Sequence, residues 1–247
     1  MKNYYLTDVG LVRDHNEDSI IVNKNLNGDY LMVVADGMGG HRAGDVASMM
    51  AVDIFGKAWS KVEGFKDRTE ALKWLNAMFM DINKSIFDYA NSHKECLGMG
   101  TTMTVALVFS DYTVIGHVGD SRCYVLTQKS LHQITSDHSL VNHLMRRGEI
   151  TEEEAQFHPK KNVLMKAVGT NKGLEVDYYD FKNDYCSILL CSDGLTNLIS
   201  NEEIYDILVN HNTVEYKVDR MIQAANDNGG YDNISVALLE VGEYKNA

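Results

Sequence analysis

Five aspartates border segments whose composition is typical of β-strands. Asp36 follows the apolar run YLMVVA and precedes a series of glycines, and Asp193 follows the similar run CSILLCS. Three more acids border other segments of this kind: Asp18, Asp120 and Asp232. Because the two outer ends of a hairpin lie at the same edge of a sheet, we expect an antiparallel sheet to gather these acids along one rim.

Such a rim of acids would need a counter-charge. Two carboxylates about 4 Å apart repel by roughly 4 kcal/mol at an effective dielectric near 20. Several such pairs would amount to a sizeable share of a domain's free energy of unfolding, which is typically about 5–15 kcal/mol. Since few basic residues lie in these segments, a divalent cation is the economical counter-charge.

The donor atoms indicate which ion would fit. Carboxylate and carbonyl oxygens suit hard cations such as Mg²⁺ or Mn²⁺, and the glycine after Asp36 leaves the Gly37 carbonyl accessible as a further donor. The spacings typical of zinc sites and EF-hands are absent from the sequence. Any one of these aspartates alone is more typical of a turn or a helix cap, so the topology leaves both interpretations open.

Composition limits the other functions. The chain has 247 residues with 45% hydrophobic and 23% charged residues, and we expect one domain over residues 1–247. A formal net charge of −12 argues against nucleic acid or an anionic membrane as a partner. No apolar run approaches the roughly 18 residues of a membrane span, and the N-terminus lacks the pattern of a signal peptide, so we expect a cytoplasmic protein. The four cysteines are expected to be reduced, buried thiols.

Periodicity predicts strands and helices in blocks rather than in strict alternation. Strands are expected at 19–22, 29–35, 102–109, 113–118, 122–126, 131–135, 177–182, 187–191 and 234–241, the middle four as a continuous meander. Helices are expected at 43–58, 68–91, 139–157, from Ser200 onward, and 214–226, with capping boxes at Thr151/Glu154 and Ser200/Glu203. Blocks of this kind favour an antiparallel α+β layered fold.

Seven motifs carry a resemblance to a known family. In chain order they are TDVGLVRDHNEDS, VADGMGGHRAGDVAS, GTTMTVALV, HVGDSRCYVL, TSDHSLV, CSDGLTNLIS and GGYDNISVALLEV. In this series the chain resembles the bacterial type 2C, metal-dependent serine/threonine protein phosphatases over residues 4–241. The resemblance implies a central antiparallel β-sandwich flanked by helices on both sides, with two Mn²⁺ or Mg²⁺ ions at one end.

The resemblance also implies a role for each acid. Asp36 is similar to the aspartate that bridges the two metals. Asp193 and Asp232 are similar to the other protein ligands of one metal, and the Gly37 carbonyl is similar to a ligand of the second metal. Glu17 and Asp18 match positions that hold metal-bound waters. Asp120, together with Asp193, matches the pair that binds a third, weaker metal.

The implied reaction is hydrolysis of phosphoserine and phosphothreonine by in-line attack of a metal-bound water or hydroxide, without a phosphoenzyme. Arg13 is similar to the arginine that grips the substrate phosphate, and a planar guanidinium suits this task because it donates two parallel hydrogen bonds. No C-x₅-R loop or GxxxxGK[ST] loop is present, which excludes the cysteine phosphatase mechanism and disfavours a P-loop NTPase. The expected partners are phosphorylated proteins, including a serine/threonine kinase and its substrates, and the chain is expected to be a monomer.

Two segments leave the interpretation open. His41 lies three residues beyond the position of the family's general acid, and we do not expect it to act as one. The stretch 145–165 is similar to the family's variable flap, and its basic residues either read acidic phosphopeptides or form a solvated face. These residues are Arg146, Arg147, Lys160 and Lys161. An inactive binding module or a structural metal-binding domain are the alternatives to an enzyme.

Overall fold

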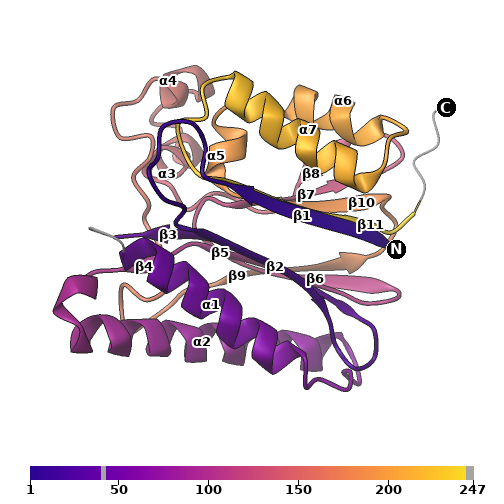
Figure 1. Cartoon of the computed structure of the whole chain (residues 1–247), viewed down its shortest axis with the longest axis horizontal. Coiled ribbons are helices and arrows are strands. Elements are labelled where there is room, and N and C mark those ends of the chain that lie inside the picture. The colour runs from indigo at the N-terminus through magenta and orange to yellow at the C-terminus, as the bar shows by residue number, and fades with distance from the viewer. Residues whose placement is uncertain (40–42, 243–247) are drawn as a thin grey trace.

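Two antiparallel β-sheets lie face to face in the computed structural model, which describes residues 1–39 and 43–242 (Figure 1). A pair of long helices covers the outer face of one sheet, and a second group of helices covers the outer face of the other (Figure 1). This arrangement confirms the predicted α+β sandwich with helices on both sides. His41, for which no catalytic role is expected, lies outside the described residues.

The strands follow two orders. The first sheet has the order β2 (Asp18–Lys24), β3 (Tyr30–Met38), β5 (Met103–Val108), β6 (Tyr112–Val118) and β9 (Asp177–Lys182), and the short β4 (Gly100–Thr101) also pairs with β3. The second has the order β1 (Lys2–Asp8), β11 (Ile234–Glu240), β10 (Ser187–Cys191), β7 (Arg122–Leu126) and β8 (Leu131–Gln133). All pairs in both sheets are antiparallel.

The helices bury apolar stripes against these sheets. The first sheet is covered by α1 (Ala43–Trp59) and α2 (Arg68–Ser92), and the second by α5 (Asp193–Thr196), α6 (Asn201–Val209) and α7 (Val214–Asp227). The remaining helical segments are the 3₁₀ turn at Lys94–Cys96, α3 (Leu140–Arg146) and α4 (Glu152–Gln156). Both predicted capping boxes are formed, at Thr151/Glu154 and at Ser200/Glu203.

The core has three layers, one under each helical group and one between the sheets. Strand β5 is buried along its whole length because both faces of its sheet are covered. The apolar runs therefore lack the alternation of a half-exposed strand. All four cysteines are buried and none forms a disulfide within the described residues, as predicted. In the described part of the chain, no helix is both long enough and apolar enough to cross a membrane.

Two predictions of the elements were wrong, and one strand was not predicted. The expected meander is interrupted, because β6 and β7 belong to different sheets and the chain crosses between them at Gly119. Gly119 has φ +116°, and a Cβ there would lie 2.5 Å from Cβ of Thr102, so the segment is a close crossover and not a hairpin turn. The expected helix 139–157 is two short helices, α3 and α4. Strand β1 was missed, since its half-exposed edge position carries only a short apolar signal.

Candidate metal centre

The hairpin β2–β3 places two acids directly opposite each other. Asp18 is the first residue of β2, and its partner in the register is Asp36, near the end of β3. Directly opposed residues of an antiparallel pair have Cβ atoms roughly 4.5–5.5 Å apart, and like charges in this position are destabilising. Asp18 is buried and Asp36 is half-buried. The predicted convergence of these two acids is therefore present in the structure.

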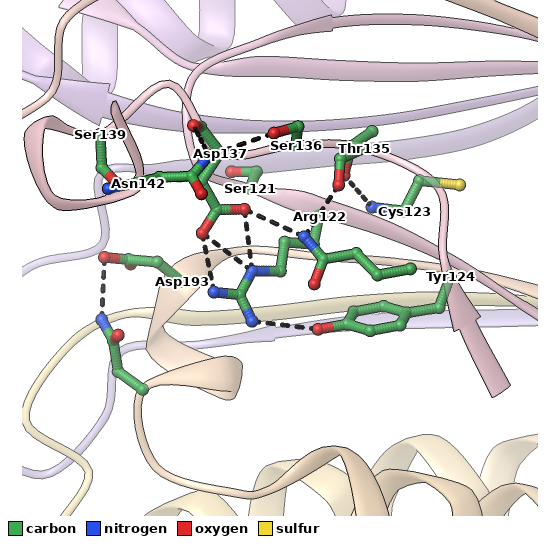
Figure 2. A network of polar contacts seen from close by, with 12 residues as sticks. Ser121, Arg122, Cys123, Tyr124, Thr135, Ser136, Asp137, Ser139, Asn142 and Asp193 are labelled. Carbon is green, nitrogen blue, oxygen red and sulfur yellow. Dashed lines mark hydrogen bonds and ion pairs between the residues drawn. The ribbon is translucent and has the colours of Figure 1, made fainter. Parts of the chain in front are cut away.

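The second sheet contributes two more acids from neighbouring strands. Asp193 begins α5 directly after β10, and Asp232 precedes β11, which pairs with β10. A Cβ at Gly194 would lie 2.0 Å from the Asn233 carbonyl oxygen, so only glycine allows these backbones to approach this closely. Asn197 Nδ2 donates to Oδ2 of Asp193 at 3.0 Å, a contact drawn beside Asp193 in Figure 2. Burial and then the charge of Asp232 raise the pKa of Asp193.

The acids of the two sheets interact with each other. Burial, then the charges of Asp18 and of Asp193 on the other sheet, raise the pKa of Asp36. Like charges held this close are unfavourable unless a proton or a cation compensates them. Ser192, the residue directly after the buried β10, donates its hydroxyl to Oδ2 of Asp18 at 2.7 Å. The sandwich therefore brings acids from both sheets to one edge.

Asp120 belongs to the same cluster. It lies at the crossover between β6 and β7, where burial, then the charges of Asp193 and Asp137, raise its pKa to about 8. Burial also raises the pKa of Asp18 to about 7, against the Ser192 and Ser235 hydroxyl groups, which lower it.

Asp36 interacts with every other acid of the cluster. Burial, then the charges of the four other acids, raise its pKa well above the ordinary 3.8. These four are Asp18, Asp193, Asp120 and Asp232. All five predicted acids thus interact electrostatically at one place, centred on Asp36.

The donor set fits a hard divalent cation. Oδ1 of Asp18 and Oδ1 of Asp193 are buried and have no hydrogen-bond partner within the described residues. Buried carboxylate oxygens without a partner are costly unless a cation compensates them, and oxygen donors suit Mg²⁺ or Mn²⁺. Across residues 1–39 and 43–242, no group of three or more acidic, histidine or cysteine side chains is placed so that it could hold a metal ion. Carboxylates that repel one another would have to move closer together around a cation.

The backbone at Gly37, beside Asp36, is packed closely against the backbone of Glu17 and Gly44. A Cβ at Gly37 would lie 2.0 Å from the Gly44 carbonyl oxygen and 2.7 Å from that of Glu17, so no side chain fits there. The Gly37 amide donates to the Glu17 carbonyl at 3.0 Å. A Cβ at Gly44 would in turn lie 2.8 Å from Oε1 of Glu17. The first turn of α1 therefore presses against the strand end that carries the two expected ligands, Asp36 and Gly37.

Arg13 lies at the rim of the cluster. Its Nη2 donates to Oδ2 of Asp232 at 2.8 Å, and its side chain is 47% exposed. Exposed ion pairs of this kind contribute little to stability, so the guanidinium can exchange one anionic partner for another. The predicted phosphate ligand thus lies beside a predicted metal ligand.

The flap region remains open to both interpretations. Arg147 forms an ion pair with Glu149 at 2.7 Å, and the side chains of Arg146, Lys160 and Lys161 are exposed. Phe157 is 86% exposed on the same segment. Exposure of this kind is compatible with a solvated face and with a surface that contacts a phosphopeptide.

A polar network beside the cluster was not predicted. Arg122 donates from Nε and Nη2 to the Asp137 carboxylate, at 2.9 and 2.7 Å, and from Nη1 to the Tyr124 hydroxyl (Figure 2). The Asp137 carbonyl accepts from Asn142 on α3. The charge of Arg122 lowers the pKa of both Asp120 and Asp193, so it is a fixed cation near the acids. The motif TSDHSLV contains Asp137, but its spacing from Arg122 gave no signal of pairing.

Comparisons with known proteins identify the family. A family model described as protein phosphatase 2C matches residues 12–239. The serine/threonine phosphatase stp of Listeria welshimeri is 44% identical over 238 residues, which cover 96% of this chain and 94% of the relative. The crystal structure of the serine/threonine phosphatase Stp1 from Staphylococcus aureus superposes with a TM-score of 0.92 at 41% identity, covering 97% of this chain and 94% of that one.

A second solved structure contains metal. The catalytic domain of the serine/threonine protein phosphatase PstP, in complex with two manganese ions, has a TM-score of 0.86 at 32% identity and 98% coverage of both chains. The fold and these matches define a phosphoprotein phosphatase, a hydrolase of the serine/threonine class. The chain belongs to the bacterial, metal-dependent protein phosphatase 2C family.

Proposed function

We propose that this phosphatase hydrolyses phosphoserine and phosphothreonine at the acid cluster, with two divalent cations bound there. The observation that carries the proposal is the burial of acids from both sheets at one edge, where Oδ1 of Asp18 and Oδ1 of Asp193 have no hydrogen-bond partner within the described residues. The two manganese ions in the PstP structure, a relative of the same fold, support a binuclear site.

The ligands are proposed from the residues that converge. Asp36 would contact both ions, Asp193 and Asp232 one of them, and the Gly37 carbonyl the other. Asp18 and Glu17 would hold waters of the site. A third cation would use Asp120 together with Asp193. When bound, the cations supply an activated water for attack on phosphorus and neutralise charge on the phosphoryl oxygens.

The chain's own residues orient the substrate. Arg13 would release Asp232 in part and donate its planar pair of N–H groups to the phosphate, which fixes the phosphorus for in-line attack. The exposed position of Arg13 suits a phosphoryl group carried on a protein surface. Asp18, held by the Ser192 hydroxyl, would position a water next to the phosphorus.

The wider assignments follow from this activity. We propose that residues 1–247 form one catalytic domain, that the protein acts as a monomer in the cytoplasm, and that its substrates are phosphorylated proteins. A serine/threonine kinase and the targets of that kinase would be among them. The net charge of −12 supports the absence of nucleic acid or an anionic membrane among the partners.

Phosphate release tests the proposal. Hydrolysis of p-nitrophenyl phosphate and of a phosphothreonine peptide is measured against Mn²⁺ concentration, after removal of metals with a chelator. Activity should rise with Mn²⁺ and saturate, and a phosphotyrosine peptide in parallel defines the range of substrates. Full activity in excess chelator would rule the proposal out.

A further inference from the structure

The side chain of Asn233, near the opposite end of the chain, forms three hydrogen bonds with the loop that carries Arg13. This loop, residues 9–17, joins β1 to β2. Asn233 Nδ2 donates to the carbonyl oxygens of Val9 at 2.9 Å and His15 at 3.0 Å, and Asn233 Oδ1 accepts from the Glu17 amide at 2.8 Å. The two amide hydrogens and the carbonyl oxygen of Asn233 are thus all used on the loop.

The contacts span the loop. Val9 and Glu17 are its two ends, and His15 lies two residues after Arg13. Asn233 is only 5% exposed, so its amide replaces water as the partner of these backbone groups. A buried hydrogen bond that is lost leaves its partners unsatisfied, and here three backbone groups would lose their partner at once.

Further contacts press the same loop onto the segment before β11. The Leu11 amide donates to the Gly230 carbonyl at 2.8 Å. Gly10 has φ +78°, and a Cβ there would lie 2.2 Å from the Asp232 carbonyl oxygen. Arg13 itself reaches Asp232, the residue next to Asn233. The geometry of Arg13 relative to Asp232 therefore depends on how the loop is seated on Asn233.

We propose that Asn233 is a positioning residue for phosphate binding, which acts through the loop and Arg13. This inference rests on the proposed function, in which Arg13 grips the phosphate. Without the amide, the guanidinium loses its fixed place beside the acid cluster, and binding of the phosphate must then order the loop. The expected loss is in affinity for phosphate groups more than in the chemical step.

Two variants of Asn233 and one control test the proposal. Asn233→Asp is isosteric and keeps an acceptor for the Glu17 amide, but it cannot donate to both Val9 and His15, since a carboxyl group carries at most one proton. Asn233→Ala removes all three contacts without adding a buried charge. The control is Asn228→Ala, which removes an exposed amide from the same connection between α7 and β11, where it donates to the Leu198 carbonyl at 2.9 Å.

Steady-state kinetics in Mn²⁺ give the first readout. We expect KM for p-nitrophenyl phosphate and the inhibition constant for inorganic phosphate to rise about tenfold in both Asn233 variants, the size typical of a lost charge-assisted contact, while kcat changes less. In an Arg13→Ala background the Asn233 substitution should change KM little further. Equal, additive losses with and without Arg13, or an unchanged KM, would overturn the proposal.

Amide hydrogen exchange gives a readout that does not depend on activity. Exchange in residues 9–17 should become at least about tenfold faster in the Asn233 variants, while β5 and β10 keep their protection, and Asn228→Ala should match the parent chain. Unchanged exchange in the loop would overturn the proposal even if the enzyme is active. Fast loop exchange in a chain that never hydrolyses phosphate would instead locate the failure in the proposed function.

Discussion

Asp18 and Asp36 lie directly opposite each other across the β2–β3 hairpin, and Ser192 of the other sheet donates its hydroxyl to Asp18 at 2.7 Å. Two ionised carboxylates in this position repel each other, so the arrangement is favourable only with a proton or a cation beside them. This relationship links the fold to the proposed chemistry. The two sheets must stack for Asp193 and Asp232 to join this pair, and a positive species must compensate the acids for them to be ionised.

Replacing Asp36 should lower the activity but raise the stability of the metal-free chain. Asp36→Asn is expected to reduce phosphate release by at least about a hundredfold, since removal of a single group in a catalytic centre typically costs this much or more. In a chelator at pH 8 the same variant should melt a few degrees above the parent chain, because it removes the carboxylate whose pKa the other four acids raise.

The matched control for Asp36 is Asp227→Asn. Asp227 is an exposed acid at the end of α7 that pairs loosely with Arg220 at 3.6 Å. Its replacement should leave both the hydrolysis rate and the melting temperature unchanged. An active Asp36→Asn variant would contradict the assignment of that residue.

The stability of the metal-free chain should depend on pH in an unusual direction. Burial raises the pKa of Asp18 to about 7 and that of Asp120 to about 8, from an ordinary 3.8. Between the ordinary pKa and these raised pKa values, the folded chain holds protons that the unfolded chain has released. The free energy of unfolding should therefore fall as the pH rises from about 4 to 8.

Urea unfolding in a chelator at pH 5, 6.5 and 8 measures this slope. With saturating Mn²⁺, the free energy of unfolding at pH 8 should instead exceed that at pH 5, because cations bind the deprotonated acids. Stability that rises steadily with pH in the chelator would show that these acids are not clustered in the metal-free fold.

Arg13 should matter for substrate and little for folding. Arg13→Ala is expected to lower kcat/KM about 10- to 100-fold, mainly through KM, since the contribution of a charge-assisted pair is of this size. Arg13→Lys should recover only part of the loss, because an ammonium lacks the planar fork. Stability should change by less than about 1 kcal/mol, since the ion pair with Asp232 is exposed.

Arg68 provides the comparison for Arg13. It forms an ion pair of 2.6 Å with Asp180 and is exposed to a similar degree, 38% against 47%. Arg68→Ala should leave the kinetics unchanged. A similar rise in KM in both variants would mean that general charge, and not the placement of Arg13, accounts for the effect.

Glycine 37 should tolerate no side chain. In Gly37→Ala the new Cβ would lie 2.0 Å from the Gly44 carbonyl oxygen, so α1 or β3 must shift, at a cost typical of overpacking, about 1–3 kcal/mol. Activity should fall with it, since Asp36 is the adjacent residue. Gly173→Ala is the control, because nothing lies within 4 Å of its Cβ position. Thermal unfolding and phosphate release measure both effects.

The convergence of the acids could be predicted from the sequence, because hairpin geometry determines which strand ends lie at the same edge of a sheet. Asp18 and Asp36 illustrate this, since a predicted hairpin placed them together and the register pairs them directly. The crossover at Gly119 was wrongly predicted as a hairpin turn. A short glycine-containing segment has the same sequence pattern whether its two strands pair or belong to different sheets.

Contacts between distant segments could not be predicted. Asn233 and Val9 are 224 positions apart, and Arg122 meets Asp137 through a turn whose geometry no local pattern specifies. Such partners become apparent only when the two sheets are stacked. The acids were detectable because five share one residue type and one kind of position, whereas a single asparagine has no such repetition.

Crystals grown with Mn²⁺ and measured at the manganese absorption edge test the central assignment most directly. The account predicts two anomalous peaks at the edge of the sandwich, bounded by the carboxylates of Asp36, Asp193 and Asp232. If those three carboxylates point away from one another and no peak lies between them, the proposed metal centre is wrong.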